Sequence, residues 1–130
     1  MSAFLTSLEV ELISDATNSG RGTWRLTAPL IYRSDVADQT FVVPAGFETD
    51  FASVPRVALA FMLCGDTAHA ASAVHDWIYT FHPVTRDVAD AVLREAAIVS
   101  GVPAWRAALL WAGVRVGGGG SHWTGAQAGA

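Results

Sequence analysis

The sequence predicts a one-domain α+β protein, in which an N-terminal antiparallel β-sheet is followed by a C-terminal helical half. Up to Gly46, polar and apolar residues alternate over short runs separated by turn-like segments, which is typical of strands. After Gly46 the apolar runs are too long for strands, and Pro55 suits the first turn of a helix. At 130 residues and 52% hydrophobic, the chain can bury one core and is short for two domains.

Three stretches of the first half predict three or four strands. They are "SLEVELI" (7–13), "GTWRLTAPLIYR" (22–33) and "TFVVPAGF" (40–47). The segments between them, "SDATNSGRG" and "RSDVADQ", are rich in Asn, Asp, Ser and Gly, as tight turns require. The first of these segments predicts a hairpin.

Helices are predicted at about 54–63, 66–80, 85–100 and 103–116. Thr85 is an N-cap residue for the third helix, and Gly101 follows its C-terminal end. The short link "FHPV" (81–84) predicts that the second and third helices form an antiparallel hairpin. We therefore expect a single α+β domain over 1–116 and a Gly-rich tail over 117–130, from which Trp123 can fold back onto the body.

Composition excludes several classes of function. The 8 basic residues are scattered and are outnumbered by 12 acidic ones, which argues against nucleic acid as a partner. A single cysteine, Cys64, cannot form an internal disulfide. The apolar run 57–64 is too short for a transmembrane segment, and the N-terminal residues lack the pattern of a secretory signal, so we expect synthesis in a cytoplasm.

The stretch "AVHDWIYT" (73–80) places His75 and Asp76 in an otherwise apolar helix. His75 lies five residues before the end of the predicted helix 66–80, and Asp90 lies five residues after the start of 85–100. At about 1.5 Å per residue, both lie about 7.5 Å from the connecting turn, so we expect them to face each other. A carboxylate in this position fixes the imidazole tautomer and stabilises the imidazolium. The pair is a candidate catalytic dyad with His75 as general base, which we expect to open to a concave pocket.

Other interpretations of the same residues remain open. Arg86, Asp90 and Arg94 follow i, i+4, i+8 spacing, which is also typical of a surface ion-pair ladder. His75 shares a helix face with Tyr79 and several small residues, where a histidine can be a core residue with satisfied hydrogen bonds.

A divalent cation is the cofactor that the sequence favours, with Asp76 and Asp50 as ligands. Asp76 is rotated about 100° from His75, so it faces a flank of the helix. Asp50 lies in "ETDFASVPR" (48–56), where loop oxygens and carboxylates suit calcium. Calcium is preferred to zinc, because His69, His75 and His82 do not match the H-E-x-x-H spacing. In the same segment Ser53 is interpreted as a helix cap, since the nucleophile pattern G-x-S-x-G is absent.

Four motifs in order resemble a phage and prophage family catalogued as domain of unknown function 1353. They are "TDFASVP", "AVHDWIY", "TRDVADAVLREAAIVSGV" and "VRVGGGGSHW", and together they span about 47–123. The resemblance implies a phage or prophage origin and implies no activity.

A more distant similarity links "HDWIY" to the H-D-x-x-Y helix of the secreted phospholipase A-two enzymes. That similarity implies that His75 activates water, that Asp76 holds calcium, and that Asp90 on the adjacent helix orients His75. The cysteines that flank the helix in those enzymes are absent here, and "AGFETDF" is the only counterpart of their calcium loop.

The function predicted from these observations is that of a small metal-assisted hydrolase with a His-Asp dyad. The alternative is a non-catalytic virion or tail component, or a module that binds another phage protein. The expected partners are phage tail or virion proteins or a cell-envelope substrate. We expect the protein to be made in the host cytoplasm and, in the structural alternative, to be incorporated in the virion.

Overall fold

A computed structural model describes residues 1–14, 22–50, 67–117 and 123. The elements are β1 (Ala3–Phe4), β2 (Val10–Ser14), β3 (Thr23–Leu26), β4 (Leu30–Ser34), β5 (Gln39–Val43), β6 (Glu48–Thr49), α2 (Thr67–Phe81), α3 (Arg86–Val99) and α4 (Ala104–Gly117). Strands precede helices, which confirms the predicted α+β class. Ser53 and the predicted helix 54–63 lie outside the described residues.

The strands form two small antiparallel sheets rather than the single sheet that the sequence predicted. One sheet has the order β1-β4-β5 and the other β2-β3-β6. The predicted stretch 22–33 divides between them, because β3 ends at Leu26 and β4 starts at Leu30. Pro29 lies in this break, and a proline has no backbone N–H to continue a strand ladder. Residues 35–38 form the turn of the β4–β5 hairpin, in which Asp38 has a φ of 51°.

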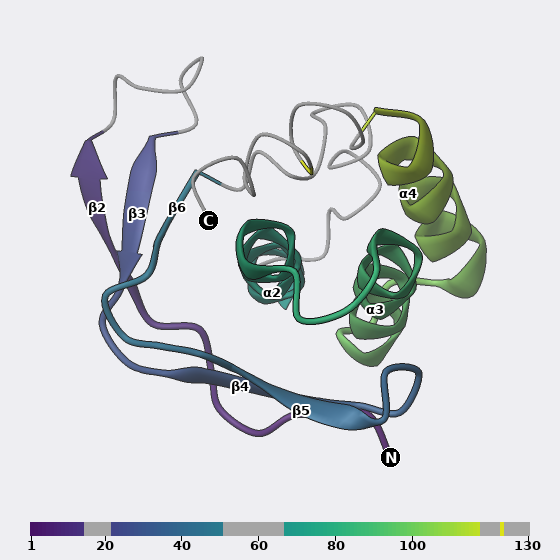
Figure 1. The fold of residues 1–130 in the computed structure, drawn as a ribbon, viewed down its shortest axis with the longest axis horizontal. Coiled ribbons are helices and arrows are strands. Elements are labelled where there is room, and N and C mark those ends of the chain that lie inside the picture. Colours follow the sequence, from purple (N-terminus) through teal and green to yellow (C-terminus); the bar gives the residue numbers. More distant parts are fainter. Residues whose placement is uncertain (15–21, 51–66, 118–122, 124–130) are drawn as a thin grey trace.

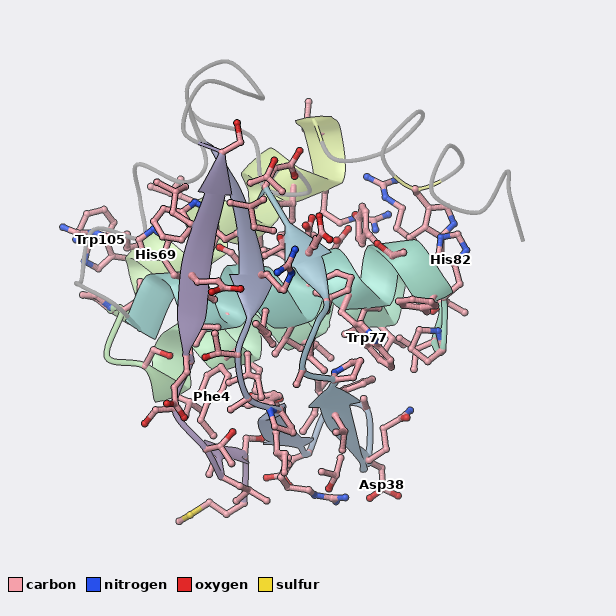
Figure 2. The ribbon with its side chains drawn as sticks, turned by 90° about the vertical axis from the view of Figure 1, so that its left-hand side faces the viewer. Phe4, Asp38, His69, Trp77, His82 and Trp105 are labelled. Atoms are coloured by element: carbon pink, nitrogen blue, oxygen red, sulfur yellow. The ribbon has the colours of Figure 1, made fainter. Side chains whose placement is uncertain are left out.

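The three helices pack on one another and on the β4–β5 hairpin. Figure 1 shows α2 and α3 side by side above this hairpin, with α4 on the side of α3 that faces away from α2. Alternate residues of the hairpin point into the core: Leu30, Tyr32, Phe41 and Val43 are buried. The facing side of α2 supplies Trp77 (Figure 2). The centroid of its ring lies 6.5 Å from that of Phe41. Burial of these apolar side chains supplies the main driving force for folding.

Local signals in the sequence determine where the helices begin and end. The hydroxyl of Thr85 accepts a hydrogen bond from the Val88 N–H at 3.3 Å, which confirms the predicted N-cap of α3. Gly101 has a φ of 104°, a backbone conformation that favours glycine after the end of a helix. The predicted antiparallel hairpin of α2 and α3 is confirmed. Within the described ranges, no helix is both long and apolar enough to cross a membrane.

Candidate functional site

His75 and Asp90, the two residues of the predicted dyad, are in contact. His75 Nε2 lies 2.8 Å from Asp90 Oδ1, and both side chains are 0% exposed. The contact follows from the fold, because α2 and α3 run antiparallel from a short link and bring the two residues to the same height. The alternative of a surface ladder on α3 is wrong for Asp90, because this carboxylate is buried.

Asp90 accepts hydrogen bonds from α2 and α4 and forms an ion pair within α3. The Tyr79 hydroxyl of α2 donates to Oδ1 at 2.6 Å, and Arg115 Nη1 of α4 donates to Oδ2 at 2.9 Å. Arg86, one turn before Asp90 on α3, places its Nε 3.7 Å from Oδ2. We call His75, Tyr79, Arg86, Asp90 and Arg115 the Asp90 network. Cations and donors on every side offset the cost of burying a carboxylate.

Arg86 joins the network to the end of α4. Its Nη2 donates to the backbone carbonyls of Val114 at 3.1 Å and Arg115 at 2.8 Å. Carbonyls in the last turn of a helix lack intrahelical partners, and a cation there also interacts favourably with the helix dipole. Its Nε donates to the Tyr79 hydroxyl at 3.2 Å. The same guanidinium therefore supports both the end of α4 and the tyrosine that holds Asp90.

The network keeps Asp90 ionised. Burial on its own raises the pKa of Asp90, but hydrogen bonds from His75, Tyr79 and Arg115 outweigh burial, and the pKa lies below its ordinary value. The hydrogen bond to Asp90 raises the pKa of Arg115. Burial, together with the bond to Asp90, raises the pKa of Tyr79, which remains a donor. An ionised carboxylate can only accept, so His75 Nε2 must donate to it, and Nδ1 of the neutral ring is then the basic nitrogen.

Complete burial of His75 differs from the sequence-based expectation. We expected this side chain to open to a concave pocket, and that expectation is wrong for this structure, because His75 is 0% exposed. Ser72, one turn before His75 on α2, is also 0% exposed. The dyad is therefore enclosed, with a geometry that suits proton transfer and no solvent-accessible surface of its own.

Asp76 points away from His75, as the helix geometry predicted. It accepts a short hydrogen bond from the hydroxyl of Thr49 in β6. Asp50 follows Thr49 in the chain, so α2 and the segment that carries Asp50 meet at this contact. Asp76 and Asp50 would supply two of the six to eight oxygen ligands that calcium takes. Within the described ranges, no three His, Cys, Asp or Glu side chains gather as a metal site.

His69 and His82 do not form a zinc site with His75. Figure 2 shows His69 and His82 at opposite ends of α2, so they are separated by most of its length. His82 ends the helix with a φ of 53°, and its N–H donates to the Ile78 carbonyl at 2.8 Å. Its ring stacks on Trp123 with 3.5 Å between ring centroids. Trp123 also meets Tyr79 edge-on at 5.0 Å, so this tail residue does pack against the body, next to the Asp90 network.

Sequence reasoning found two members of the network as a pair and missed both arginines. Arg115 could have been found by the counting that paired His75 with Asp90. Asp90 lies nine residues before the end of α3, and Arg115 lies eleven residues after the start of α4, across another short link. Arg86 was interpreted only as a member of a surface ladder. Its capping contact depends on the angle between α3 and α4, which no local pattern specifies.

A second carboxylate of α3, Glu95, also accepts several hydrogen bonds, on the side of the helix that faces the sheet. Glu95 Oε1 accepts from the hydroxyls of Tyr32 at 2.7 Å and Ser34 at 2.8 Å, and Oε2 accepts from the Val36 N–H at 2.9 Å. Tyr32 and Ser34 lie on β4, and Val36 lies in the turn that follows. Glu95 therefore ties the β4–β5 hairpin to α3. Sequence reasoning did not single out this residue.

Comparison with known proteins gave one family match. A family model described as "Protein of unknown function (DUF1353)" matches residues 24–114. This range contains every residue of the Asp90 network except Arg115, which follows its last residue. No curated protein and no solved structure matches the chain.

Proposed function

Since the chain belongs to the DUF1353 family of proteins of unknown function, we propose its function from the site itself: a small hydrolase in which His75 activates water. The observation that carries the proposal is the 2.8 Å contact between His75 Nε2 and Asp90, a carboxylate that Tyr79 and Arg115 also hold. A histidine oriented by a buried acid is the arrangement that makes imidazole an effective general base.

The proposed chemistry uses the residues of the network in separate functions. Nδ1 of His75 takes a proton from water as the water oxygen attacks the substrate, and Asp90 stabilises the imidazolium that results. The imidazolium then gives this proton to the leaving group as the substrate bond breaks, which restores the neutral imidazole. Tyr79 and Arg115 are positioning residues, because they touch Asp90 rather than the reacting atoms. The similarity of "HDWIY" to the phospholipase A-two helix supports this assignment of His75 and Asp90. Bond cleavage requires the enclosed site to open to its substrate.

Asp76 and Asp50 are the residues that would hold a divalent cation in this proposal. Calcium fits better than zinc, because both residues provide carboxylate oxygens, which are hard ligands. When bound, the cation would polarise the bond under attack. Calcium should then raise the melting temperature of the wild type, and Asp76→Asn should abolish that rise. If calorimetry detects no heat of binding at millimolar calcium, the cation is removed from the proposed mechanism and only a metal-free mechanism remains.

The proposed setting is a bacteriophage or prophage, as the resemblance to the family implies. Such a protein would be made in the host cytoplasm, and its substrate would belong to the cell envelope. Envelope lipid, peptidoglycan and peptide are the three substrate classes that a water-activating dyad would meet there. They differ in the bond that is cleaved but share the need for a general base.

A hydrolysis assay with matched variants tests the proposal. The wild type is incubated with phosphatidylglycerol and phosphatidylethanolamine vesicles, with purified peptidoglycan and with a peptide pool, and products are followed by mass spectrometry. His75→Asn should reduce turnover of the cleaved substrate by about 10²–10⁴-fold, the usual contribution of a general base. His69→Asn changes an exposed histidine of the same helix and should leave turnover unchanged. No turnover on any of the three substrates would reject the hydrolase.

Complete burial of His75 and Asp90 favours a second candidate function, a non-catalytic virion or tail component. In that case the Asp90 network joins three helices and does nothing else. Because His75 is buried against Asp90, His75→Ala should lower the free energy of unfolding by about 2–4 kcal/mol under either function. The structural function predicts in addition that virions carrying the variant fail to assemble. The hydrolase instead predicts assembled particles that contain an inactive protein.

A further inference from the structure

A groove on the outer side of α3 has the composition of a ligand site that the proposed hydrolase does not use. It measures about 670 Å³, within the usual range for small-molecule sites. It lies between the C-terminal half of α3, the turn that joins β4 to β5, the N-terminus and α4. Figure 1 shows the N-terminus and this turn together below α3. Its apolar lining includes Val36, Ala91, Ile98, Val99 and Trp111.

The apolar part of the groove is open to solvent. Val36 is 50% exposed, Ile98 is 45% exposed and Val99 is 41% exposed. From α3, Ala91, Arg94, Glu95 and Ile98 line the groove at i, i+3, i+4 and i+7, which is one face of a helix. The groove is therefore a surface that a ligand can reach without any change in the fold.

Arg94 gives the groove a positive charge that no carboxylate neutralises within the described residues. Its guanidinium lies 5.8 Å from the ring centroid of Trp111, and the ion pairs of the described residues do not include it. Asp90, one turn earlier, already accepts from His75, Tyr79 and Arg115. This cation–π contact with the indole holds the guanidinium beside the apolar lining of the groove.

The two carboxylates that line the groove are already engaged. Glu95 directs both oxygens to Tyr32, Ser34 and the Val36 N–H. Asp35 pairs with the amino group of Met1 at 3.1 Å and lies 3.9 Å from Arg33 Nε. Neither acid reaches Arg94. The groove thus combines one charged donor with a mostly apolar surface. It complements a ligand that has an anionic group at one end and an apolar body.

We infer that this groove binds an apolar monocarboxylic acid, with its carboxylate on Arg94 and its chain along Ile98, Val99 and Trp111. A carboxylate suits the guanidinium because it can accept two parallel hydrogen bonds. The apolar chain would cover side chains that are otherwise left in water. The inference is independent of the proposed hydrolase, since the ligand touches neither His75 nor Asp90.

The test uses decanoate, below its micelle concentration, as the probe and ¹⁵N-labelled protein. Saturable shifts of the Trp111 indole N–H and of the α3 backbone amides around Ile98 are expected. Decanol has the same chain without the charge and should bind about tenfold more weakly, the effect of losing a charge-assisted hydrogen bond. Arg94→Gln should reduce decanoate affinity to the level of decanol.

Two further variants keep the test decisive. Arg106 stacks on Trp105 with 5.3 Å to the ring centroid, and Figure 2 shows Trp105 at the edge of the molecule, so Arg106→Gln removes a similar cation elsewhere and should change nothing. Ile98→Glu places a negative charge one turn from Arg94 and should also reduce the affinity for decanoate. Equal affinities for decanoate and decanol, an unchanged affinity in Arg94→Gln, or shifts only at Trp105 or His75 would each overturn the inference.

Discussion

Two carboxylates on the same helix, Asp90 and Glu95, show how similar contacts can have different consequences. Each accepts a short hydrogen bond from a buried tyrosine, Tyr79 at 2.6 Å for Asp90 and Tyr32 at 2.7 Å for Glu95. Around Asp90 the other partners are a histidine and two arginines. Around Glu95 they are a serine hydroxyl and a backbone N–H.

The difference lies in charge and in the presence of a base. Neutral donors hold Glu95 in place, and these contacts join the β4–β5 hairpin to α3. A structural role is enough to explain them, and no catalytic role is needed. The Asp90 network instead contains an imidazole, whose second nitrogen is left basic by the bond to Asp90. We therefore assign architecture to the Glu95 side of α3 and the proposed chemistry to the Asp90 side.

The largest expected difference between the two sides is in stability. Asp90→Asn removes the negative charge between His75, Arg86 and Arg115, and breaking a buried ion pair in this way costs about 3–5 kcal/mol. Glu95→Gln keeps one carbonyl acceptor among neutral donors and should cost about 1–2 kcal/mol. Urea denaturation of both variants measures the difference. Equal losses would break the distinction between a charged and a neutral network.

Substitution of the two matched tyrosines should have an intermediate effect on stability, and it separates the two carboxylates by their effect on turnover. Tyr79→Phe and Tyr32→Phe each remove a hydroxyl that donates to a carboxylate of α3, and each should cost about 1.5–3 kcal/mol. Only Tyr79→Phe should also slow hydrolysis, because Tyr79 holds the acid that orients His75. Its denaturation curve and turnover are compared with those of Tyr32→Phe. A fall in turnover of the same size in both variants would indicate a general loss of structure.

The smallest expected effect is a decrease in the free energy of unfolding at low pH. The pKa of Asp90 in the folded protein lies below the ordinary value of about 3.9, so its contribution is fully present above about pH 4. It is lost as the pH falls through the folded pKa, with a slope of at most about 1.4 kcal/mol per pH unit.

The stability gap between the wild type and Asp90→Asn should therefore narrow below pH 4. Chemical denaturation from pH 2.5 to pH 7 measures this gap. A gap that stayed constant over the whole range would show that Asp90 contributes no charge to the folded network.

The sequence predicted the parts of the site that depend on counting along one hairpin of helices. His75 and Asp90 were paired because helix rise is regular and the link between α2 and α3 is short. Thr85 and Gly101 were identified because caps depend on a residue's own chemistry. The fold class followed from the change of hydrophobic period near Gly46.

Long-range packing accounts for what the sequence did not predict. Glu95 meets residues about sixty positions earlier in the chain, and no local pattern relates a helix position to strand partners at that distance. The division of the strands into two sheets depends on where the chain turns near Pro29, which alternation of polar and apolar residues does not encode. Enclosure of His75 likewise results from how three helices pack.

Nitrogen NMR of the His75 ring tests the central claim most directly. In the proposed dyad, ionised Asp90 accepts a hydrogen bond from Nε2 of His75, so that Nδ1 is the base. Recorded where the ring is neutral, the ¹⁵N shifts and the attached proton should place the hydrogen on Nε2, with a proton signal moved downfield by the bond to Asp90. Asp90→Asn should remove that downfield shift. A proton found on Nδ1 in the wild type would contradict the account, because Nε2 would then accept and Asp90 could not be the ionised acid that orients a base.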